Sequence, residues 1–338
     1  MKVLVLAEQY STNEKISQAF IHTRNCEYIK NNIDVDVISF ATKEQYNLDG
    51  IEVFPLDKFS EKCDVEKYDI VISHAPNIRN HCKFINKNIK KINKIVFFFH
   101  GHEVLISKEI YPKPYDFVKK DNFVKETIRN VYDRVKLIYM SKFLNKVLEK
   151  STYVFVSEWM YKQFNKNIKI REEKYKDKSH IIYNSMGNIF LEKNYDINQK
   201  KEYDFITIRN ILDVSKYSID LVIEIAKKNP KYKFLVIGKG EIFNYYKPPK
   251  NLKFELRNLK HTEIIEYLNK SKYALMPTRA DAQGVMMCEM ATFGIPVITS
   301  DISVCNDVLG DIENVRLISN NIENIDINDT INNLYPAK

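Results

Sequence analysis

The sequence predicts an α/β protein made of two doubly wound domains. In both halves of the chain, short apolar segments typical of buried parallel strands alternate with amphipathic segments of helical period. A polar stretch of weak periodicity, from 184 to about 202, separates the two halves. The chain has 338 residues and a hydrophobic content of 44%, which is enough for a core in each half. Ligands of such sheets bind beyond the carboxyl ends of the strands, so we expect a site in a cleft between the domains.

The first domain is expected at 1–190. Its candidate strands are short runs rich in β-branched and aromatic residues, which suits a parallel sheet covered on both faces. A helix is expected at Ile16–Asn31, and a longer basic helical insertion, about 113–150, follows the fifth strand. The candidate strands are Lys2–Ala7, Val35–Ser39, Ile51–Phe54, Ile70–Ser73, Ile95–Phe99, Tyr153–Val156 and His180–Tyr183.

The second domain is expected at 202–320, where residues that break regular structure mark the ends of elements. Pro230 follows a candidate helix and Gly238 follows a candidate strand. The tail, 321–338, is expected to pack back on the first domain. The candidate elements are strands Tyr203–Ile208, Lys233–Ile237, Leu252–Leu256, Tyr273–Met276 and Val297–Thr299, and helices Asp220–Asn229, Thr262–Ser271 and one that Gly284 opens.

The net charge of +8 is unevenly distributed. The segment from Lys113 to Lys178 holds 17 Lys and Arg against 9 Asp and Glu, an excess equal to that of the whole chain. This basic region is either a solvated helical face or a surface attracted to an anionic partner such as a membrane. It contains no nucleic-acid recognition motif, so we expect no nucleic-acid partner.

The cysteines and the first residues indicate a cytoplasmic protein. The five cysteines are scattered and include no C-x-x-C pair, which predicts reduced thiols and neither a disulfide framework nor a zinc site. The apolar start, Lys2–Ala7, is too short for a signal peptide, and no apolar run approaches the roughly 18 residues of a membrane span. Attraction to the inner face of the plasma membrane stays open because of the basic region.

Two carboxylates near the end of the second domain form the most informative pattern. Asp281 and Glu289 stand eight positions apart, a little over two helical turns, and Gly284 opens the helix between them. Both carboxylates can therefore flank one ligand. The N–H groups of Gln283, Gly284 and Val285 at the helix start would point at an anion. A nucleotide sugar needs this layout, with acceptors for its hydroxyls and donors for its diphosphate.

This segment and its tail, Met290–Thr299, resemble the E-x7-E signature of retaining glycosyltransferases of family 4, with Asp281 in place of the first Glu. The resemblance implies the GT-B fold, two Rossmann-like domains facing across a cleft, with the acceptor side in the first domain. It also implies sugar transfer from a nucleoside diphosphate sugar with retention of configuration. Asp281 would then bind sugar hydroxyls and Glu289 the ribose.

A strand-end arginine and a loop lysine suit the diphosphate. Arg209 ends the strand that begins at Tyr203, and Lys216 follows before the next helix. Arg offers a planar fork to two oxygens, and Lys offers a mobile point charge. The resemblance assigns both residues to the donor pyrophosphate. Gly238 and Gly240 resemble the G-x-G turn of the family at the end of the following strand.

His100 ends the apolar strand Ile95–Phe99, where the resemblance places a histidine that faces the donor sugar. His102 could pair with it at a metal, but no further His or Cys lies nearby in the sequence to complete such a site. No Asp-x-Asp motif serves the site, so we expect metal-independent transfer. There is no G-x-G-x-x-G after the first strand, and we expect no cofactor besides the nucleotide-sugar substrate.

These observations favour a retaining hexosyltransferase that uses a UDP-sugar. Its acceptor would be a carbohydrate, a lipid-linked sugar or a protein, and by analogy the product would be bacterial surface polysaccharide or glycoconjugate. Two alternatives stay open: a non-catalytic glycosyltransferase-like partner subunit, and a sugar-nucleotide epimerase or hydrolase on the same fold.

Overall fold

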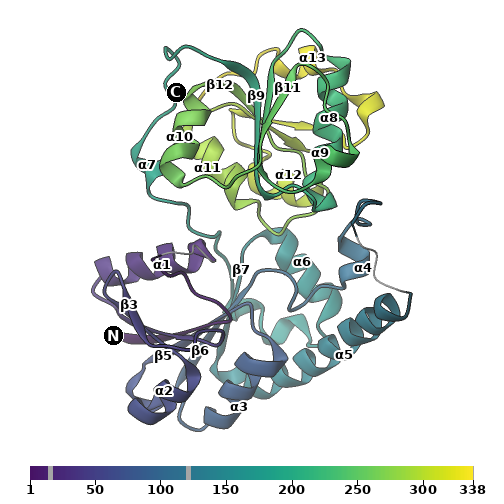
Figure 1. Ribbon diagram of the computed structural model, residues 1–338. Helices are drawn as coiled ribbons and strands as arrows, with labels where there is room; N and C mark the ends of the chain where they lie inside the picture. The colour runs from purple at the N-terminus through teal and green to yellow at the C-terminus, as the bar shows by residue number, and fades with distance from the viewer. Residues whose placement is uncertain (14–17, 119–122, 338) are drawn as a thin grey trace. The chain divides into compact units, whose positions relative to one another are not determined.

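The computed structural model describes residues 1–13, 18–118 and 123–337, which form two compact α/β units (Figure 1). Unit 1 comprises Met1–Ser107 and Phe123–Ser185, and unit 2 comprises Lys108–Asn122 and Met186–Lys338. The boundary after Ser185 lies within five residues of the expected end of the first domain at 190. The assignment of 108–118 to unit 2 differs from the prediction, which placed this segment in the first domain, and positions 119–122 of the predicted basic insertion lie outside the described residues.

The described residues of unit 1 contain an eight-stranded sheet in the order β3-β4-β2-β1-β5-β6-β7-β8. All neighbouring strands are parallel except the β3–β4 pair at one edge. The strands are β1 (Lys2–Ala7), β2 (Asp34–Ser39), β3 (Tyr46–Leu48), β4 (Ile51–Phe54), β5 (Ile70–His74), β6 (Lys94–Phe99), β7 (Ser151–Phe155) and β8 (Ser179–Ile181). The helices are α1 (Ala19–Lys30), α2 (Leu56–Lys62), α3 (Lys83–Asn88), α5 (Phe123–Val147) and α6 (Glu158–Asn167), with α4 (Ser107–Ile110) at the unit boundary.

Unit 2 contains a parallel sheet in the order β11-β10-β9-β12-β13-β14, which is the Rossmann order 3-2-1-4-5-6. The chain therefore reverses direction across the sheet between β9 and β12, where such sheets bind ligands at the carboxyl ends of the strands. The strands are β9 (Tyr203–Ile211), β10 (Phe234–Lys239), β11 (Leu252–Glu255), β12 (Ser271–Leu275), β13 (Val297–Ser300) and β14 (Val315–Ile318). The helices are α7 (Ile189–Glu192), α8 (Ile219–Lys228), α9 (Ile242–Tyr245), α10 (His261–Asn269), α11 (Val285–Phe293), α12 (Ser303–Leu309) and α13 (Ile327–Ile331).

The predicted strands are confirmed to within three residues at their ends, because most of them are apolar runs that the sheet buries. The exceptions are β8 and β11, which have more exposed than buried residues. The sequence prediction omitted β3 and β14, which are short and lie at sheet edges. The expected helix at Ile16–Asn31 begins at Ala19 in the structure, and positions 16 and 17 lie outside the described residues.

Aromatic side chains attach residues 111–118 to unit 2. Tyr115 is buried, and its hydroxyl donates to Asp220 Oδ1 at 2.8 Å at the start of α8. Phe117 stacks on Tyr245 with ring centroids 4.4 Å apart. Tyr115 belongs to the same apolar core as β9, β10 and α8, and Phe117 packs against that core. This burial explains why the segment belongs to unit 2, although the chain reaches it from β6 of unit 1.

Helix α5 is the helical part of the predicted basic insertion. Its buried Lys136 donates to the carbonyl oxygens of His102 and Leu105 at 2.6 and 2.9 Å, and to Asp133 Oδ1 at 2.7 Å. Asp133 in turn accepts from the N–H of Ser107. The inner face of α5 is thus fixed to the loop after β6. Among the residues that the structure describes, no helix combines the length and apolarity needed to cross a membrane.

The tail is a correction to the sequence prediction. Ile327 and Leu334 are buried in the apolar core of unit 2, and the N–H of Ala337 donates to the carbonyl oxygen of Gly294. The described residues of the tail therefore pack within unit 2, because they carry apolar side chains that complete its core.

We predict that the Tyr115 anchor contributes measurably to the stability of unit 2. Tyr115→Phe keeps the ring and removes the hydrogen bond to Asp220, at an expected cost of about 1 kcal/mol. Tyr115→Ala also removes the buried ring, at an expected cost of about 3–5 kcal/mol. Thermal and urea unfolding of both variants checks this, with Tyr335→Phe, whose residue is 67% exposed, as the control. Equal stability of Tyr115→Ala and wild type would contradict the anchor.

Candidate functional site

Arg209 spans the point where the sheet of unit 2 changes direction. It lies near the carboxyl end of β9, and its Nη2 donates to the carbonyl oxygens of Met276 and Pro277, just after β12, at 3.1 and 2.9 Å. Its guanidinium also lies 4.7 Å from the ring centroid of Tyr217. The residue is only 6% exposed. The structure therefore places the predicted phosphate-binding arginine at the switch point of the sheet, where sheets of this order bind ligands.

The electrostatics of Arg209 favour an anionic ligand. Burial lowers the pKa of the guanidinium, and the charge on Asp281 opposes this change. Arginine still remains charged in proteins. Its buried Nε has no hydrogen-bond partner within the protein, and neither has the buried Oγ of Ser218 in the neighbouring loop. A buried donor without a partner costs roughly 1–3 kcal/mol, which an anion accepting from it would offset.

Lys216 lies on a single 3₁₀ turn, Ser215–Tyr217, between β9 and α8. Its Nζ lies 4.8 Å from the ring centroid of Tyr217. The aromatic ring of Tyr217 therefore contacts both cations of the predicted clamp. Ser218 follows in the left-handed conformation, with φ of 54°, and opens α8.

Arg279 fixes this turn, and the sequence prediction did not include it. Its N–H donates to the carbonyl oxygen of Lys216 at 2.7 Å, and its Nη1 donates to that of Ser215 at 2.9 Å. The same guanidinium binds both carboxylate oxygens of Asp220 at 2.8 and 2.7 Å. The sequence did offer one signal for Arg279. It lies between Pro277 and Asp281, in the loop that follows the carboxyl end of β12.

Gly238 is required by a close approach of two strands. A Cβ at this position would overlap the carbonyl oxygen of Arg209 on the neighbouring strand. The glycine therefore lets the end of β10 pass directly beside Arg209. Gly238 thus lies beside Arg209, and its role toward the donor stays a prediction.

Asp281 caps the loop that leads into α11. Gly284 has φ of +81° at the start of that helix, a conformation that favours glycine. Asp281 Oδ1 accepts the N–H groups of Ala282, Gln283 and Gly284 at 2.8, 3.4 and 3.1 Å. Two of the three N–H groups predicted to bind an anion, those of Gln283 and Gly284, are therefore occupied by Asp281 in this conformation. The third is that of Val285, the first residue of α11.

Glu289 is buried about one turn into α11, at 5% exposure. Its Oε1 accepts the N–H of Gly187 at 2.9 Å, and burial raises the pKa of its carboxyl to about 7. A Cβ at Gly187 would lie 2.9 Å from His261 Nδ1 and 3.4 Å from Glu289 Oε1. Glu289 and His261 therefore meet at the backbone of Gly187. Neither Gly187 nor His261 was predicted, because both are distant from Glu289 in the sequence.

His100 lies in unit 1, at the end of β6. One ring nitrogen, Nε2, lies 3.1 Å from Nδ1 of His74, and the other, Nδ1, has no partner within the protein. Burial, aided by the charge of Arg24, lowers the pKa of His100 to about 3, so the ring is neutral at pH 7. The N–H of His100 donates to Glu103 Oε1. Its role toward a donor sugar stays a prediction.

The comparisons with known proteins give the family and the folds that this chain resembles. Residues 192–336 match the family model described as glycosyl transferases group 1. This part of the chain is similar to that family, and the match covers less than half of the chain. Arg209, Lys216, Gly238, Asp281 and Glu289 all lie within the matched residues. The two Rossmann-like units give the GT-B fold class expected from the sequence.

One known relative is similar to this chain over a short segment, and the solved structures are similar to it over nearly its whole length. An O-antigen biosynthesis glycosyltransferase, WclY of Escherichia coli, is 31% identical over 140 residues, which cover 38% of this chain and 38% of that protein. Sucrose-phosphate synthase from Thermosynechococcus elongatus aligns with a TM-score of 0.66 at 11% identity, covering 98% of this chain and 88% of that one. Anabaena HepE, solved with UDP and glucose, aligns at 0.63 and 13% identity, covering 98% and 89%. These structural likenesses establish the fold.

We predict that Glu289 makes stability depend on pH. Its pKa in the folded protein, about 7, lies above the ordinary value of 4.5, so the folded state holds the proton more tightly than the unfolded state. The resulting stabilisation is full below the ordinary value and is lost as pH rises through about 7. Between about pH 5 and about pH 8, wild type should lose about 2 kcal/mol more unfolding free energy than Glu289→Gln. Urea unfolding at both pH values checks this, and an equal loss in the two proteins would contradict it.

Proposed function

We propose that this protein is a retaining glycosyltransferase that moves a sugar from a nucleoside diphosphate sugar, a UDP-sugar by preference, to a hydroxyl acceptor. The match to the group 1 family model supports the donor class. The O-antigen enzyme and the UDP-bound and glucose-bound HepE support a bacterial surface polysaccharide or glycoconjugate as product and UDP as the nucleotide. The acceptor is a carbohydrate, a lipid-linked sugar or a protein.

The observation that carries the proposal is the buried, incompletely paired Arg209 at the β9–β12 switch point. Arg209 and Lys216 bind the diphosphate from the carboxyl end of β9. Arg279 acts as a positioning residue, because it holds the backbone of the turn that carries Lys216. Electrostatic stabilisation of the departing diphosphate by such donors can supply roughly 3–4 kcal/mol for each well-aimed contact.

The two carboxylates have different tasks in this proposal. Glu289 accepts ribose hydroxyls, because its Oε2 remains after Oε1 has accepted the N–H of Gly187. Asp281 binds hydroxyls of the donor sugar. When Asp281 turns toward the sugar, it releases the N–H groups of Gln283 and Gly284, which then donate to the diphosphate. Sugar and diphosphate binding thereby support each other.

The transfer step breaks the bond between the anomeric carbon and the diphosphate oxygen. The acceptor hydroxyl forms a new bond to that carbon from the same face, and its proton passes to the departing diphosphate oxygen. No carboxylate nucleophile is needed, and the charge of the leaving group is met by Arg209, Lys216 and backbone N–H groups. We expect this reaction to need no metal ion.

We predict that Glu289→Ala lowers donor turnover about 100-fold or more while the fold is retained, because the ribose loses its buried acceptor. The measurement is nucleotide release from UDP-, GDP- and ADP-sugars without acceptor, with and without EDTA. Release from one donor, lost in the variant and insensitive to EDTA, is the expected result. Glu323→Ala, at a glutamate whose side chain is 73% exposed, is the matched control.

Unchanged release by Glu289→Ala would contradict the assignment of the site. If no donor is turned over, calorimetric titration with UDP and GDP separates the remaining readings. Nucleotide binding would indicate an enzyme that requires its acceptor, and no binding would favour the non-catalytic partner subunit.

The exposed face of α5 supports a membrane-associated transferase. Five large apolar side chains on this face are each more than half exposed, and they recur every three or four residues. The opposite face of the helix carries its own apolar residues into the core of unit 1. The exposed residues are Ile128 (61%), Val131 (56%), Tyr132 (55%), Val135 (56%) and Ile138 (57%).

Cations accompany this apolar stripe. Arg134, Lys142 and Lys146 are exposed on the same helix. A helix that combines exposed apolar residues with cations binds at the headgroup level of an anionic bilayer, with its axis in the plane of the interface. We propose that the outer face of α5 docks on the anionic inner face of the plasma membrane, where lipid-linked acceptors reside.

We predict that the protein binds phosphatidylglycerol-containing vesicles, and that salt weakens this binding. Replacing Ile128, Val131, Val135 and Ile138 together by Ser should weaken it roughly 10-fold or more, because the apolar contacts with lipid are lost. Vesicle flotation at several salt concentrations is the measurement. The residues are exposed, so the variant should keep the unfolding temperature of wild type.

Leu191→Ser with Ile197→Ser, which are 58% and 64% exposed in unit 2, is the control for apolar loss elsewhere. No binding at low salt would mean that the basic face is merely solvated. A wild type that self-associates in light scattering, while the quadruple variant does not, would assign the stripe to a second copy of the chain instead.

A further inference from the structure

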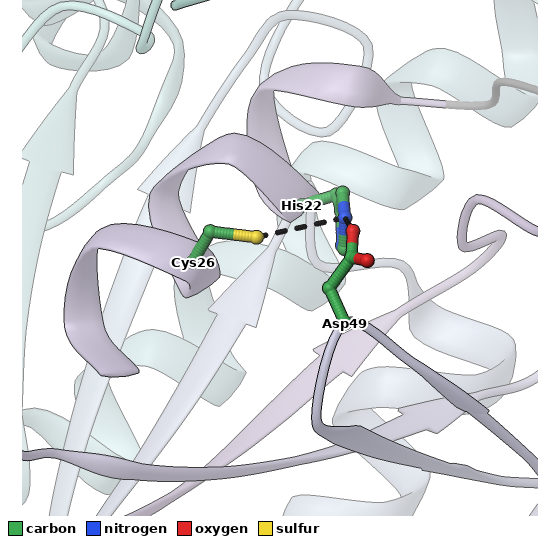
Figure 2. Close-up of side chains that lie close together, drawn as sticks. All are labelled: His22, Cys26 and Asp49. Atoms are coloured by element: carbon green, nitrogen blue, oxygen red, sulfur yellow. Dashed lines mark hydrogen bonds and ion pairs between the residues drawn. The ribbon is translucent and has the colours of Figure 1, made fainter. Parts of the chain in front are cut away.

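Three side chains that can bind a metal converge in unit 1 at the edge of the sheet. His22 and Cys26 lie four residues apart on α1 and therefore on one face of that helix. Asp49 lies in the two-residue turn between β3 and β4, where it has φ of 50° and Gly50 has φ of 82°. Figure 2 shows all three directed toward one point, and their ligand atoms lie within 4.8 Å of one another.

The contacts converge on a single ring nitrogen. His22 Nε2 lies 2.9 Å from Asp49 Oδ2 and 3.5 Å from Cys26 Sγ. This nitrogen has either one proton to give to the carboxylate or one lone pair to receive the thiol proton, so it cannot satisfy both. In a hydrolytic triad the nucleophile and the carboxylate contact opposite ring nitrogens, which excludes that reading. A cation in place of the proton would bind all three groups at once.

The other ring nitrogen has the support that a metal-binding histidine requires. His22 Nδ1 lies 2.9 Å from the hydroxyl of Tyr10, a residue at 4% exposure, and Nδ2 of the buried Asn25 donates to the same hydroxyl. When Nδ1–H donates to Tyr10, the Nε2 lone pair faces Asp49 and Cys26. Such outer contacts fix the tautomer and the ring orientation of metal-bound histidines.

The distances suit a tetrahedral ion. Arms of about 2.0–2.3 Å place the nitrogen and sulfur ligands about 3.6 Å apart, and the nitrogen and oxygen ligands about 3.3 Å apart. The N–S separation of 3.5 Å already fits, and the N–O separation of 2.9 Å needs a small shift of an exposed turn. Asp49 is 68% exposed at its side chain, so water can take the fourth position.

We propose that His22, Cys26 and Asp49 bind Zn²⁺ or a similar thiolate-preferring divalent cation, with water as the fourth ligand. One imidazole, one thiolate and one carboxylate form a donor set that suits zinc, and their two negative charges neutralise it. The ion ties α1 to the β3–β4 turn and, through Tyr10, to the segment after β1. The sequence pattern predicted no zinc site because Asp49 comes from a distant element. The proposal uses no residue of unit 2 and leaves sugar transfer metal-independent.

Titration of EDTA-stripped full-length protein with Zn²⁺ and with Co²⁺ tests the site. We expect one equivalent of either ion to bind, and the Co²⁺ complex to show near-ultraviolet thiolate-to-metal absorption. Cys26→Ser should abolish that absorption and weaken Zn²⁺ binding about 100-fold or more, and Tyr10→Phe should weaken it about 10-fold. Cys63→Ser, at another half-buried free thiol of unit 1, is the matched control and should leave both unchanged.

Hydrogen exchange gives a second readout, since Zn²⁺ should slow exchange in the β3–β4 hairpin of wild type and not of Asp49→Asn. Asp49 is exposed, so its variant should fold in EDTA as wild type does. Absence of saturable Zn²⁺ binding would overturn the proposal. Binding that survives both Cys26→Ser and Asp49→Asn would overturn it as well, because the ion would then be held elsewhere.

Discussion

The guanidinium of Arg209 is the contact on which the candidate site of unit 2 depends. The Rossmann strand order leaves the carboxyl ends of β9 and β12 side by side, and Arg209 bridges them through two carbonyl oxygens. Burial makes this cation expensive unless an anion joins it, and the partnerless Nε shows where the protein has left a donor unused. Position 238 needs a glycine because β10 passes so close to the backbone of Arg209 on β9 that a side chain would overlap it. In the proposed site, this one buried charge gives the switch point between β9 and β12 its preference for anions.

Near Arg209, the ion pair between Arg279 and Asp220 holds in place the turn that carries Lys216. Asp220 balances Arg279, and Arg279 can therefore fix the turn of Lys216 without competing for a ligand itself. Tyr115 adds a hydroxyl to Asp220, so the segment between β6 and α5 also supports the turn. Lys216 itself stays on a short loop. In the proposed clamp, the fixed arginine sets the position of the diphosphate, and the lysine on its turn follows the ligand.

The sequence predicted those parts of the structure that local patterns determine. Buried strands show as apolar runs, and the ends of parallel strands made Arg209 a candidate. Asp281 and Glu289 were proposed from their spacing, and the roles of all three residues stay predictions. Contacts between distant segments left no such signal. Arg279 with Asp220, and Gly187 with Glu289, become partners only after the sheet has formed. The tail was misplaced for the same reason: its few apolar residues have no period that names the core they enter.

Unit 1 illustrates the same limit with helices. Helix α5 has apolar residues on both faces, and a periodicity analysis averages them into a weakly amphipathic, basic segment. Only the structure separates the face that Lys136 fixes to the loop after β6 from the face that remains in water. The His22 cluster is similar, since helical spacing brings two of its members together and a hairpin turn supplies the third. In both cases, side chains without a suitable partner remain at the surface after the core is complete. An apolar face exposed to water costs free energy, and so does a set of metal-binding side chains that lacks its ion. The proposed partners, an anionic bilayer for α5 and a divalent cation for the His22 cluster, each remove that cost.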